Sequence, residues 1–391
     1  PASPWCWPAT WRATSTARLS RLMVDSWPHR LSTSPNIVQR RLATQHLIGH
    51  KFATPAGAIA FFGAVQGQDT LYSFWALGMR VAGATEATIE QAIADRQLVR
   101  NWPMRTTLHY VTAADARWIV KLNAESTLRG AARRLREEGL DDDTLTRARR
   151  VITAALQANG PMARPDLLNT LDAAGISPAG QRGYYMLWYY ANEGLIAIGP
   201  RIGKQQSIVL LDEWLPPTQE KTREEALGEL ARRYFTSHGP AQLKDFVWWS
   251  SLAAAEARAG LEMVKLQLVG ESVGGKEYWY DPNQPTEGAN PSVAHLLPYL
   301  DEYIVAYRDR DDFLNPVFND LVDSGNVIFH APFLIDGHVA GHWRRLLKKK
   351  RVIIEMTAFR PLSDPERDAL AGEADRFGAF VGLPAEMYWV G

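Results

Sequence analysis

Apolar residues recur with the period of an amphipathic helix in two stretches in the middle of the chain. Residues 146–158 and 223–236 each place their apolar side chains on one face of a helix. A Gly-Pro pair follows each helix, at 160–161 and at 239–240. This shared pattern indicates an internal repeat, because each copy reaches the same turn after the same kind of helix.

Both copies then continue in the same order. A short helix and a longer helix precede two short apolar strands, at 195–199 and 207–211 in one copy and at 265–269 and 277–280 in the other. A helix, a turn, two further helices and a two-stranded wing form the layout of a winged helix-turn-helix. The sequence therefore predicts tandem winged helix-turn-helix domains.

A third and more divergent copy precedes these two. Its helices are expected at residues 36–49, 54–66 and 69–79, and residues 102–111 would supply its wing strands. The second of these helices opens with a Thr-Pro pair, which is typical of an N-cap followed by the first helical residue.

The C-terminal part of the chain changes from helical to alternating patterns. Residues 326–329 and 333–341 alternate, and the Asp336-Gly337 pair signals a two-residue hairpin turn. Residues 351–359 predict a further strand, and residues 362–380 predict a closing helix.

The predicted fold class is therefore mixed α+β: tandem winged helix-turn-helix domains followed by a small antiparallel β domain with a C-terminal helix. Residues 1–35 show no periodicity, so we expect a poorly ordered N-terminal extension there. The other predicted ranges are winged helix 1 with a linker helix at 36–140, winged helix 2 at 141–218, winged helix 3 at 219–290 and the β domain at 291–391.

Composition narrows the class of protein. With 46% hydrophobic and 22% charged residues, the 391-residue chain is typical of globular proteins, and it has no apolar run long enough to span a membrane. Its only cysteine, Cys6, excludes an intramolecular disulfide and favours a reducing, cytoplasmic setting. The zero net charge argues mildly against nucleic-acid binding, although local basic patches can still supply it.

Several kinds of chemistry leave no motif in the sequence. The chain has no glycine-rich phosphate loop, no paired-histidine metal motif and no nucleophile elbow. We therefore expect neither a cofactor nor a metal. An enzyme of this composition would work with polar side chains and water.

Two carboxamides stand out between apolar runs, in the Gln66-Gly67-Gln68 motif. At this spacing on a helix their side chains would point to opposite faces. We expect Gly67 to break the helix at a positive φ so that the amides converge, and Asp69 to cap the next helix. A polar turn between two helices explains the same pattern.

Five motifs in order resemble the AlkZ/YcaQ-like winged-helix DNA glycosylases over residues 36–391. They are Arg40-Arg41-Leu42-Ala43-Thr44-Gln45, Gly63…Gln66-Gly67-Gln68-Asp69, Trp102…Met104-Arg105-Thr106-Thr107-Leu108-His109, Leu297-Pro298…Asp301-Glu302-Tyr303…Arg308-Asp309-Arg310 and Asp336-Gly337…Ala340-Gly341…Trp343. The resemblance implies monofunctional excision of bulky alkylated purines, as in self-resistance enzymes that unhook interstrand crosslinks.

The resemblance also implies catalytic roles for Gln66 and Gln68, which match the outer positions of the family's signature. The chain departs from the family at Gly67, where an aliphatic residue is usual, and at Thr106, which replaces a glycine. An alkylated purine is already cationic and leaves without a strong general acid. We expect Gln68 to position the attacking water and Gln66 to hydrogen-bond the water or the sugar.

Basic residues on predicted strands and hairpins are the candidate DNA contacts, although structural roles explain several of them equally well. They are Arg105 and His109 on the first wing, Arg201 and Lys204 at the second wing tip, and Arg344 and Lys348 in the basic cluster at 344–351. The expected partner is double-stranded DNA carrying alkylated purines or crosslinks, bound by a monomer near the nucleoid. A non-catalytic regulator or a lesion-binding protein is the alternative.

Overall fold

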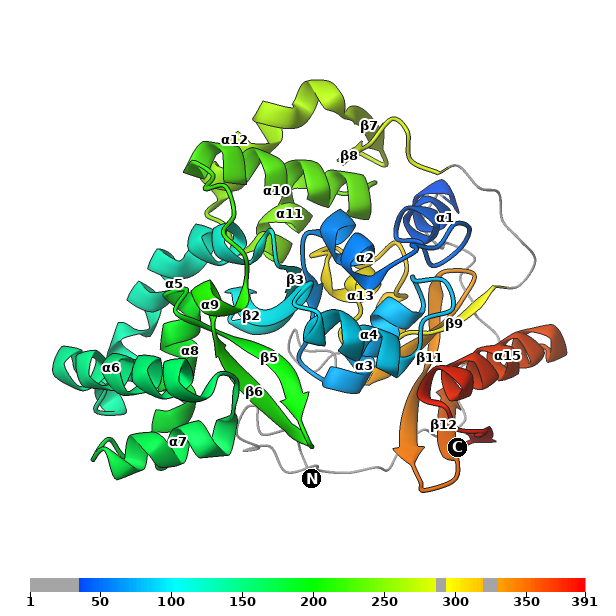
Figure 1. Ribbon diagram of the computed structural model, residues 1–391. Helices are drawn as coiled ribbons and strands as arrows, with labels where there is room; N and C mark the ends of the chain where they lie inside the picture. Colours follow the sequence, from blue (N-terminus) through cyan, green and yellow to red (C-terminus); the bar gives the residue numbers. More distant parts are fainter. Residues whose placement is uncertain (1–34, 286–292, 319–329, 391) are drawn as a thin grey trace.

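The computed structural model describes residues 35–285, 293–318 and 330–390 (Figure 1). It confirms a mixed α+β fold. The predicted extension at 1–35 lies outside the described residues except for its last residue, and so does the strand predicted at 326–329. Within the described residues, none of the helices combines the length and the apolar composition needed to cross a membrane.

A six-stranded antiparallel sheet joins the strands predicted as the wings of the first two copies, with the order β1-β3-β2-β5-β6-β4. Strands β2 and β5 connect the two halves through the pair Arg100–Ile198. The repeat pattern did not predict this joint sheet. The strands are β1 (Val65–Gln66), β2 (Leu98–Met104), β3 (Thr107–Thr112), β4 (Met162–Ala163), β5 (Ile196–Ile202) and β6 (Gln205–Leu210).

The first copy supplies α1 (Pro35–Thr44), α2 (Pro55–Phe62), α3 (Thr70–Gly78) and α4 (Glu86–Ala94). Thr54 caps α2 and Pro55 is its first residue, as the Thr-Pro pair predicted. The expectation that this helix continues to Gln66 is wrong. It ends at Phe62 because Gly63 takes a positive φ of 83°, and the chain then enters β1.

α5 (Ala116–Glu137) lies where the linker helix of the first range was predicted. The range predicted for the second copy contains α6 (Asp142–Asn159), α7 (Arg164–Ala173), α8 (Arg182–Asn192) and α9 (Leu211–Trp214), and that for the third contains α10 (Arg223–His238), α11 (Leu243–Ser250) and α12 (Ala254–Val264). Strands β7 (Val269–Val273) and β8 (Lys276–Tyr280) pair as a hairpin. The strand predicted at 265–269 is wrong, because Lys265–Gln267 continues from α12 as a 3-10 turn.

The C-terminal part contains a five-stranded sheet with the order β13-β12-β11-β10-β9. The Asp336-Gly337 hairpin between β10 and β11 is confirmed. The sheet is not purely antiparallel as predicted, because β13 returns after α15 to pair in parallel with β12. The elements are β9 (Ala294–Leu296), α13 (Glu302–Val305), β10 (Ala331–Ile335), β11 (His338–Leu347), β12 (Val352–Ala358), α15 (Asp364–Val381) and β13 (Ala385–Trp389).

The larger of two hydrophobic cores packs the first copy against the C-terminal part. Trp75 of α3 contacts the rings of Phe377 and Phe380 on α15. Arg80 forms a buried bidentate ion pair with Asp301, with both hydrogen bonds at 2.8 Å. This core also includes α10 and α12 of the third copy, so the domain boundaries at 140, 218 and 290 stay predictions.

Two hairpins, β5–β6 and β11–β12, extend to the same side of the molecule in Figure 1. Gln206 of β6 donates a hydrogen bond to Thr70, and Arg345 of β11 donates one to Asp69. Residues 69–70 at the start of α3 are therefore held from both hairpins, directly after the Gln66-Gly67-Gln68 motif.

Candidate active site

Gln66 ends a short strand and Gln68 lies in the bend that follows it, so neither stands at a break in a helix. Gln66 is the last residue of β1 and pairs with His109 of β3. The Gly67 amide donates to the Leu108 carbonyl at 2.6 Å, and the Gln68 Oε1 atom accepts from the Leu108 amide at 3.1 Å. Both residues are therefore tied to β3, Gln66 through strand pairing and Gln68 through its side chain.

Gly67 does not provide the predicted positive φ, because the positive φ belongs to Gly63. Its role is a close approach instead. A Cβ atom at position 67 would lie 3.0 Å from the Tyr110 ring and 3.2 Å from the Cδ atom of Arg100. The predicted N-cap is confirmed, since the Asp69 side chain accepts a hydrogen bond from the Tyr72 amide at 2.9 Å.

The buried carboxylate of Glu302 anchors the backbone of Gln66. It accepts hydrogen bonds from the Gln66 amide at 2.8 Å and from the Trp249 indole at 2.9 Å, and the His238 ring lies 3.5 Å away. Burial alone would raise the pKa of Glu302, but the hydrogen bond from His238 and the positive charge of Arg105 lower this pKa to about 2. Glu302 is therefore ionised at neutral pH.

Arg105 fixes the side chain of Gln66 from the other direction. Its guanidinium donates to the Gln66 Oε1 atom at 2.8 Å and to the Trp249 carbonyl at 2.7 Å. Arg105 lies in the β2–β3 turn, not on the wing strand as predicted, and both it and Thr106 have a φ of 52°. Its guanidinium faces inward within this turn, so the DNA contact of Arg105 stays a prediction.

The His109 ring contacts the Arg105 guanidinium. Its Nε2 atom lies 3.1 Å from the Arg105 guanidinium, and its Nδ1 atom lies 3.0 Å from the Thr107 carbonyl. A guanidinium only donates and a carbonyl only accepts, so the ring is neutral with its proton on Nδ1. Burial and the Arg105 charge lower the pKa of His109 to about 3. Because the side chain is fully buried, we expect a supporting role in place of the predicted DNA contact.

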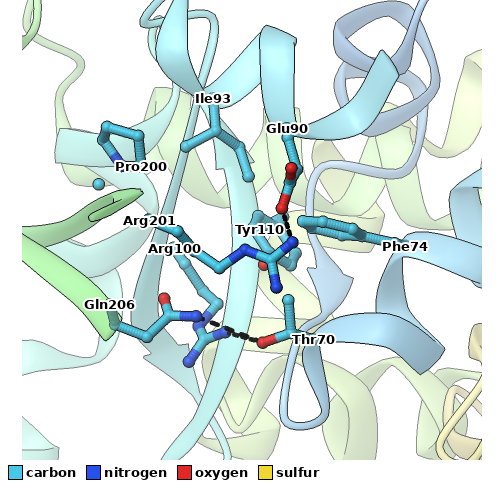
Figure 2. Close-up of a pocket in the computed structure, with 10 residues that line it drawn as sticks. Thr70, Phe74, Glu90, Ile93, Arg100, Tyr110, Pro200, Arg201 and Gln206 are labelled. Atoms are coloured by element: carbon cyan, nitrogen blue, oxygen red, sulfur yellow. Dashed lines mark hydrogen bonds and ion pairs between the residues drawn. The ribbon is translucent and has the colours of Figure 1, made fainter. Parts of the chain in front are cut away.

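The second wing tip contains one paired and one exposed basic residue. Arg201 forms ion pairs with Glu86 at 3.0 Å and with Glu90, so its charge is already balanced by α4 (Figure 2). Lys204 lies exposed in the β5–β6 turn. Of these two predicted DNA contacts, Lys204 is the one that the structure leaves available to a phosphate.

The tip of the β11–β12 hairpin combines apolar and basic side chains. Leu346 and Leu347 are 37% and 52% exposed, next to the exposed Lys348. Arg344 lies further back on β11 and pairs with Glu355. The sequence pattern did not lead us to predict a role for these two leucines, although their position directly before the basic run Lys348-Lys349-Lys350-Arg351 could have indicated one.

The sequence analysis also missed the supporting residues of the site. Glu302 occurs in one of the family motifs, yet nothing in the pattern placed it beneath Gln66. Trp249 and Arg100 carried no signal of their own. No cluster of three or more His, Cys, Asp or Glu side chains suited to a metal occurs in the described residues.

A family model and a solved structure identify the class of protein to which this fold belongs. The family model described as DNA glycosylase AlkZ-like matches residues 59–380, and the chain belongs to this family. Among solved structures, Streptomyces sahachiroi DNA glycosylase AlkZ is similar to it, with a TM-score of 0.73 and 18% sequence identity. The match covers 91% of this chain and 100% of that one, and it shows a shared fold. No curated protein sequence matches the chain.

Proposed function

We propose that this protein is a monofunctional DNA glycosylase that hydrolyses the N-glycosidic bond of bulky alkylated purines, including purines joined in interstrand crosslinks. Membership of the AlkZ-like family supports the glycosylase class. The observation that carries the proposal is that Gln66 ends β1 and Gln68 follows it, with Gln66 held by both Arg105 and Glu302 and Gln68 held by the Leu108 amide.

The main task of the protein in this reaction is to position the attacking water. Alkylation at N7 or N3 makes the purine cationic, so the base leaves as a neutral molecule while positive charge moves to the sugar. Water then adds at C1′, and its proton passes to the surrounding solvent. Holding that water within about 2.6–3.2 Å of a carboxamide is the task for which Gln66 and Gln68 are suited.

The two amides have different surroundings and therefore different proposed roles. The Gln66 oxygen already accepts from Arg105, so its amide nitrogen is the atom directed at the water or the sugar edge. Gln68 is half-buried and is the residue that positions the water. Fixed geometry of this kind lowers the barrier by several kcal/mol, because the ordering is completed before the reaction.

The proposed partner is double-stranded DNA bound by a single copy of the chain in the cytoplasm. Lys204 on one hairpin and Lys348 on the other supply phosphate contacts on either side of the motif, and Arg344 adds to the second. The exposed leucines of the β11–β12 tip suit the apolar wedge that minor-groove proteins place between base steps.

A base-release assay tests the proposal. Duplexes carrying one N7-methylguanine or one bulky N7-alkylguanine are incubated with the protein, and released base is measured by chromatography against a protein-free control. The wild-type protein is expected to release both bases. We expect Gln68→Ala to lower the rate about 100-fold and to leave duplex affinity unchanged, because only the water loses its position.

The matched control is Arg133→Met, which removes an exposed charge on α5 that is paired with Glu137. It should release base at the wild-type rate. A wild-type protein that binds damaged duplex without releasing base would instead be a lesion-binding protein. Unchanged release by Gln68→Ala would remove Gln68 from the mechanism.

A further inference from the structure

Arg100 is a buried cation next to the Gln66-Gly67-Gln68 motif, and neither the family signature nor the mechanism accounts for it. It lies on β2 with 1% of its surface exposed. Its guanidinium donates to the Thr70 hydroxyl at 3.0 Å, while its Nε atom has no partner within the described parts of the chain. Those parts place no carboxylate in an ion pair with it, and its aromatic neighbour is the Tyr110 ring, 5.9 Å from the guanidinium carbon. Burying an arginine without a carboxylate costs several kcal/mol, more than a cation–π contact at this distance returns, so its presence points to a role beyond stability.

Gly67 is what allows Arg100 to occupy this place. The Cδ atom of Arg100 would lie only 3.2 Å from a Cβ atom at position 67, and the Tyr110 ring only 3.0 Å. Both distances are tighter than ordinary van der Waals contact. Because Gly67 has no positive φ to explain it, its missing side chain is explained by the space that Arg100 and Tyr110 fill.

The Arg100 side chain ends at the start of α3, directly after Gln68. Figure 2 shows the Arg100 guanidinium and the Gln206 amide converging on the Thr70 hydroxyl, with donor–acceptor distances of 3.0 Å and 3.4 Å. The cavity beside them is about 20 Å³, which is room for about one water molecule.

A second arginine holds the neighbouring residue. Arg345 donates to Asp69 at 3.0 Å and lies over the Tyr72 ring at 3.7 Å. The turn that contains Gln68 is therefore fixed at Thr70 from the six-stranded sheet and at Asp69 from the C-terminal sheet.

We propose that Arg100 is a positioning residue for Gln68, acting through Thr70, and that Gly67 is required in this chain because it admits Arg100. This inference rests on the proposed function, because Gln68 needs a fixed position only if it orients the water. The gain in catalytic geometry offsets the cost of burying the unpaired charge.

The first test replaces Arg100 with Met, which keeps most of the volume and removes the charge and the hydrogen bond. We expect kcat for base release to fall about tenfold with KM nearly unchanged, since the substrate still binds but the water is misplaced. Thermal stability should stay equal or rise, because an unpaired buried charge is gone. Arg100→Lys should recover part of kcat, and the exposed Arg133→Met is the control.

Hydrogen exchange provides a readout that does not depend on activity. Backbone amides of residues 67–72 should exchange faster in Arg100→Met than in the wild-type protein, while amides of the α6 core should not change. Equal exchange in residues 67–72 would overturn the positioning role. A loss of stability that parallels the loss of kcat would also overturn it, because Arg100 would then be a structural residue.

The second test concerns the Gly67–Arg100 pair. Gly67→Val should lower kcat strongly, because the new side chain meets Arg100 and Tyr110. Gly67→Val combined with Arg100→Ala should lose less kcat than the two single losses added together, since the smaller residue removes one of the two clashes while Tyr110 stays. Additive losses in the double variant would contradict the pairing.

The two proposals fail in distinguishable ways. A wild-type protein that releases no base contradicts the proposed function, while hydrogen exchange still decides whether Arg100 fixes the turn. A wild-type protein that releases base while Arg100→Met keeps full kcat contradicts only the role of Arg100.

Discussion

The candidate site has a buried end around Gln66 and an exposed end at the tip of the β11–β12 hairpin, and charged residues are placed differently in the two. Next to Gln66, Glu302 is buried and Arg105 is half-buried, and each makes at least two hydrogen bonds of 2.9 Å or less. At the β11–β12 tip, Lys348 and the neighbouring leucines are exposed. The buried end has one well-defined geometry, whereas the exposed end is free to adapt to a partner.

This difference follows from the free energy of burying charge. A buried carboxylate is tolerable only with nearly complete hydrogen bonding, so Glu302 and its donors hold one another in place. An exposed pair such as Arg344–Glu355 contributes little, because water screens both charges. Chemistry that needs a fixed water benefits from the first arrangement, and contact with a variable DNA backbone benefits from the second.

The largest expected effect comes from removing the buried acid. Glu302→Ala leaves the Gln66 amide and the Trp249 indole without their acceptor and Arg105 without a nearby negative charge. We expect the free energy of unfolding to fall by about 3–5 kcal/mol, measured by urea titration.

The matched change at the exposed end is Glu355→Ala, which removes the partner of Arg344. It should lower the free energy of unfolding by no more than about 1 kcal/mol. Similar losses in the two variants would contradict the contrast between the buried and exposed ends.

An intermediate effect concerns pH. The pKa of His109 falls from 6.5 in the unfolded chain to about 3 in the folded protein. Between these two pH values the unfolded state binds a proton on this residue and the folded state does not. Stability from this group is full above pH 6.5 and is lost as the pH falls toward 3. Glu302 acts in the same direction but only below its ordinary pKa of 4.5.

The His109→Gln variant isolates the contribution of His109 to the pH dependence of stability, because glutamine can still accept a hydrogen bond from Arg105 but does not titrate. Between pH 6.5 and 4.5 its free energy of unfolding should fall less steeply than that of the wild-type protein, by up to about 1.4 kcal/mol per pH unit. Denaturant titrations at several pH values measure both slopes. Parallel slopes would mean that His109 is not buried neutral.

The smallest effect on the folded protein is expected at the hairpin tip. Leu347→Ser should change the free energy of unfolding by no more than about 0.5 kcal/mol, because the side chain is 52% exposed. Its affinity for lesion-containing duplex should fall about tenfold, the loss expected when a leucine no longer enters an apolar contact. Fluorescence anisotropy measures this affinity, and an unchanged value would exclude the tip from the interface.

Local signals in the sequence were the most accurate. Thr54-Pro55 and Asp69 are caps whose hydrogen bonds reach only three residues along the chain, and the Asp336-Gly337 turn closes a hairpin between neighbouring strands. The strand predicted at 265–269 failed because a short apolar segment suits a strand and a 3-10 turn equally well.

By itself, the sequence determined that two glutamines stand together before a capped helix and that the chain resembles DNA glycosylases of one family. Only the tertiary structure decided that Gln66 ends a strand with Gln68 in the bend after it, that Glu302 anchors the Gln66 amide from a distance of 236 residues and that Gly67 makes room for Arg100. Caps and turns depend on neighbours in the chain, which the sequence displays directly. A buried charge meets its partner only when distant segments pack together, and the periodicity of the sequence does not predict which residues these will be.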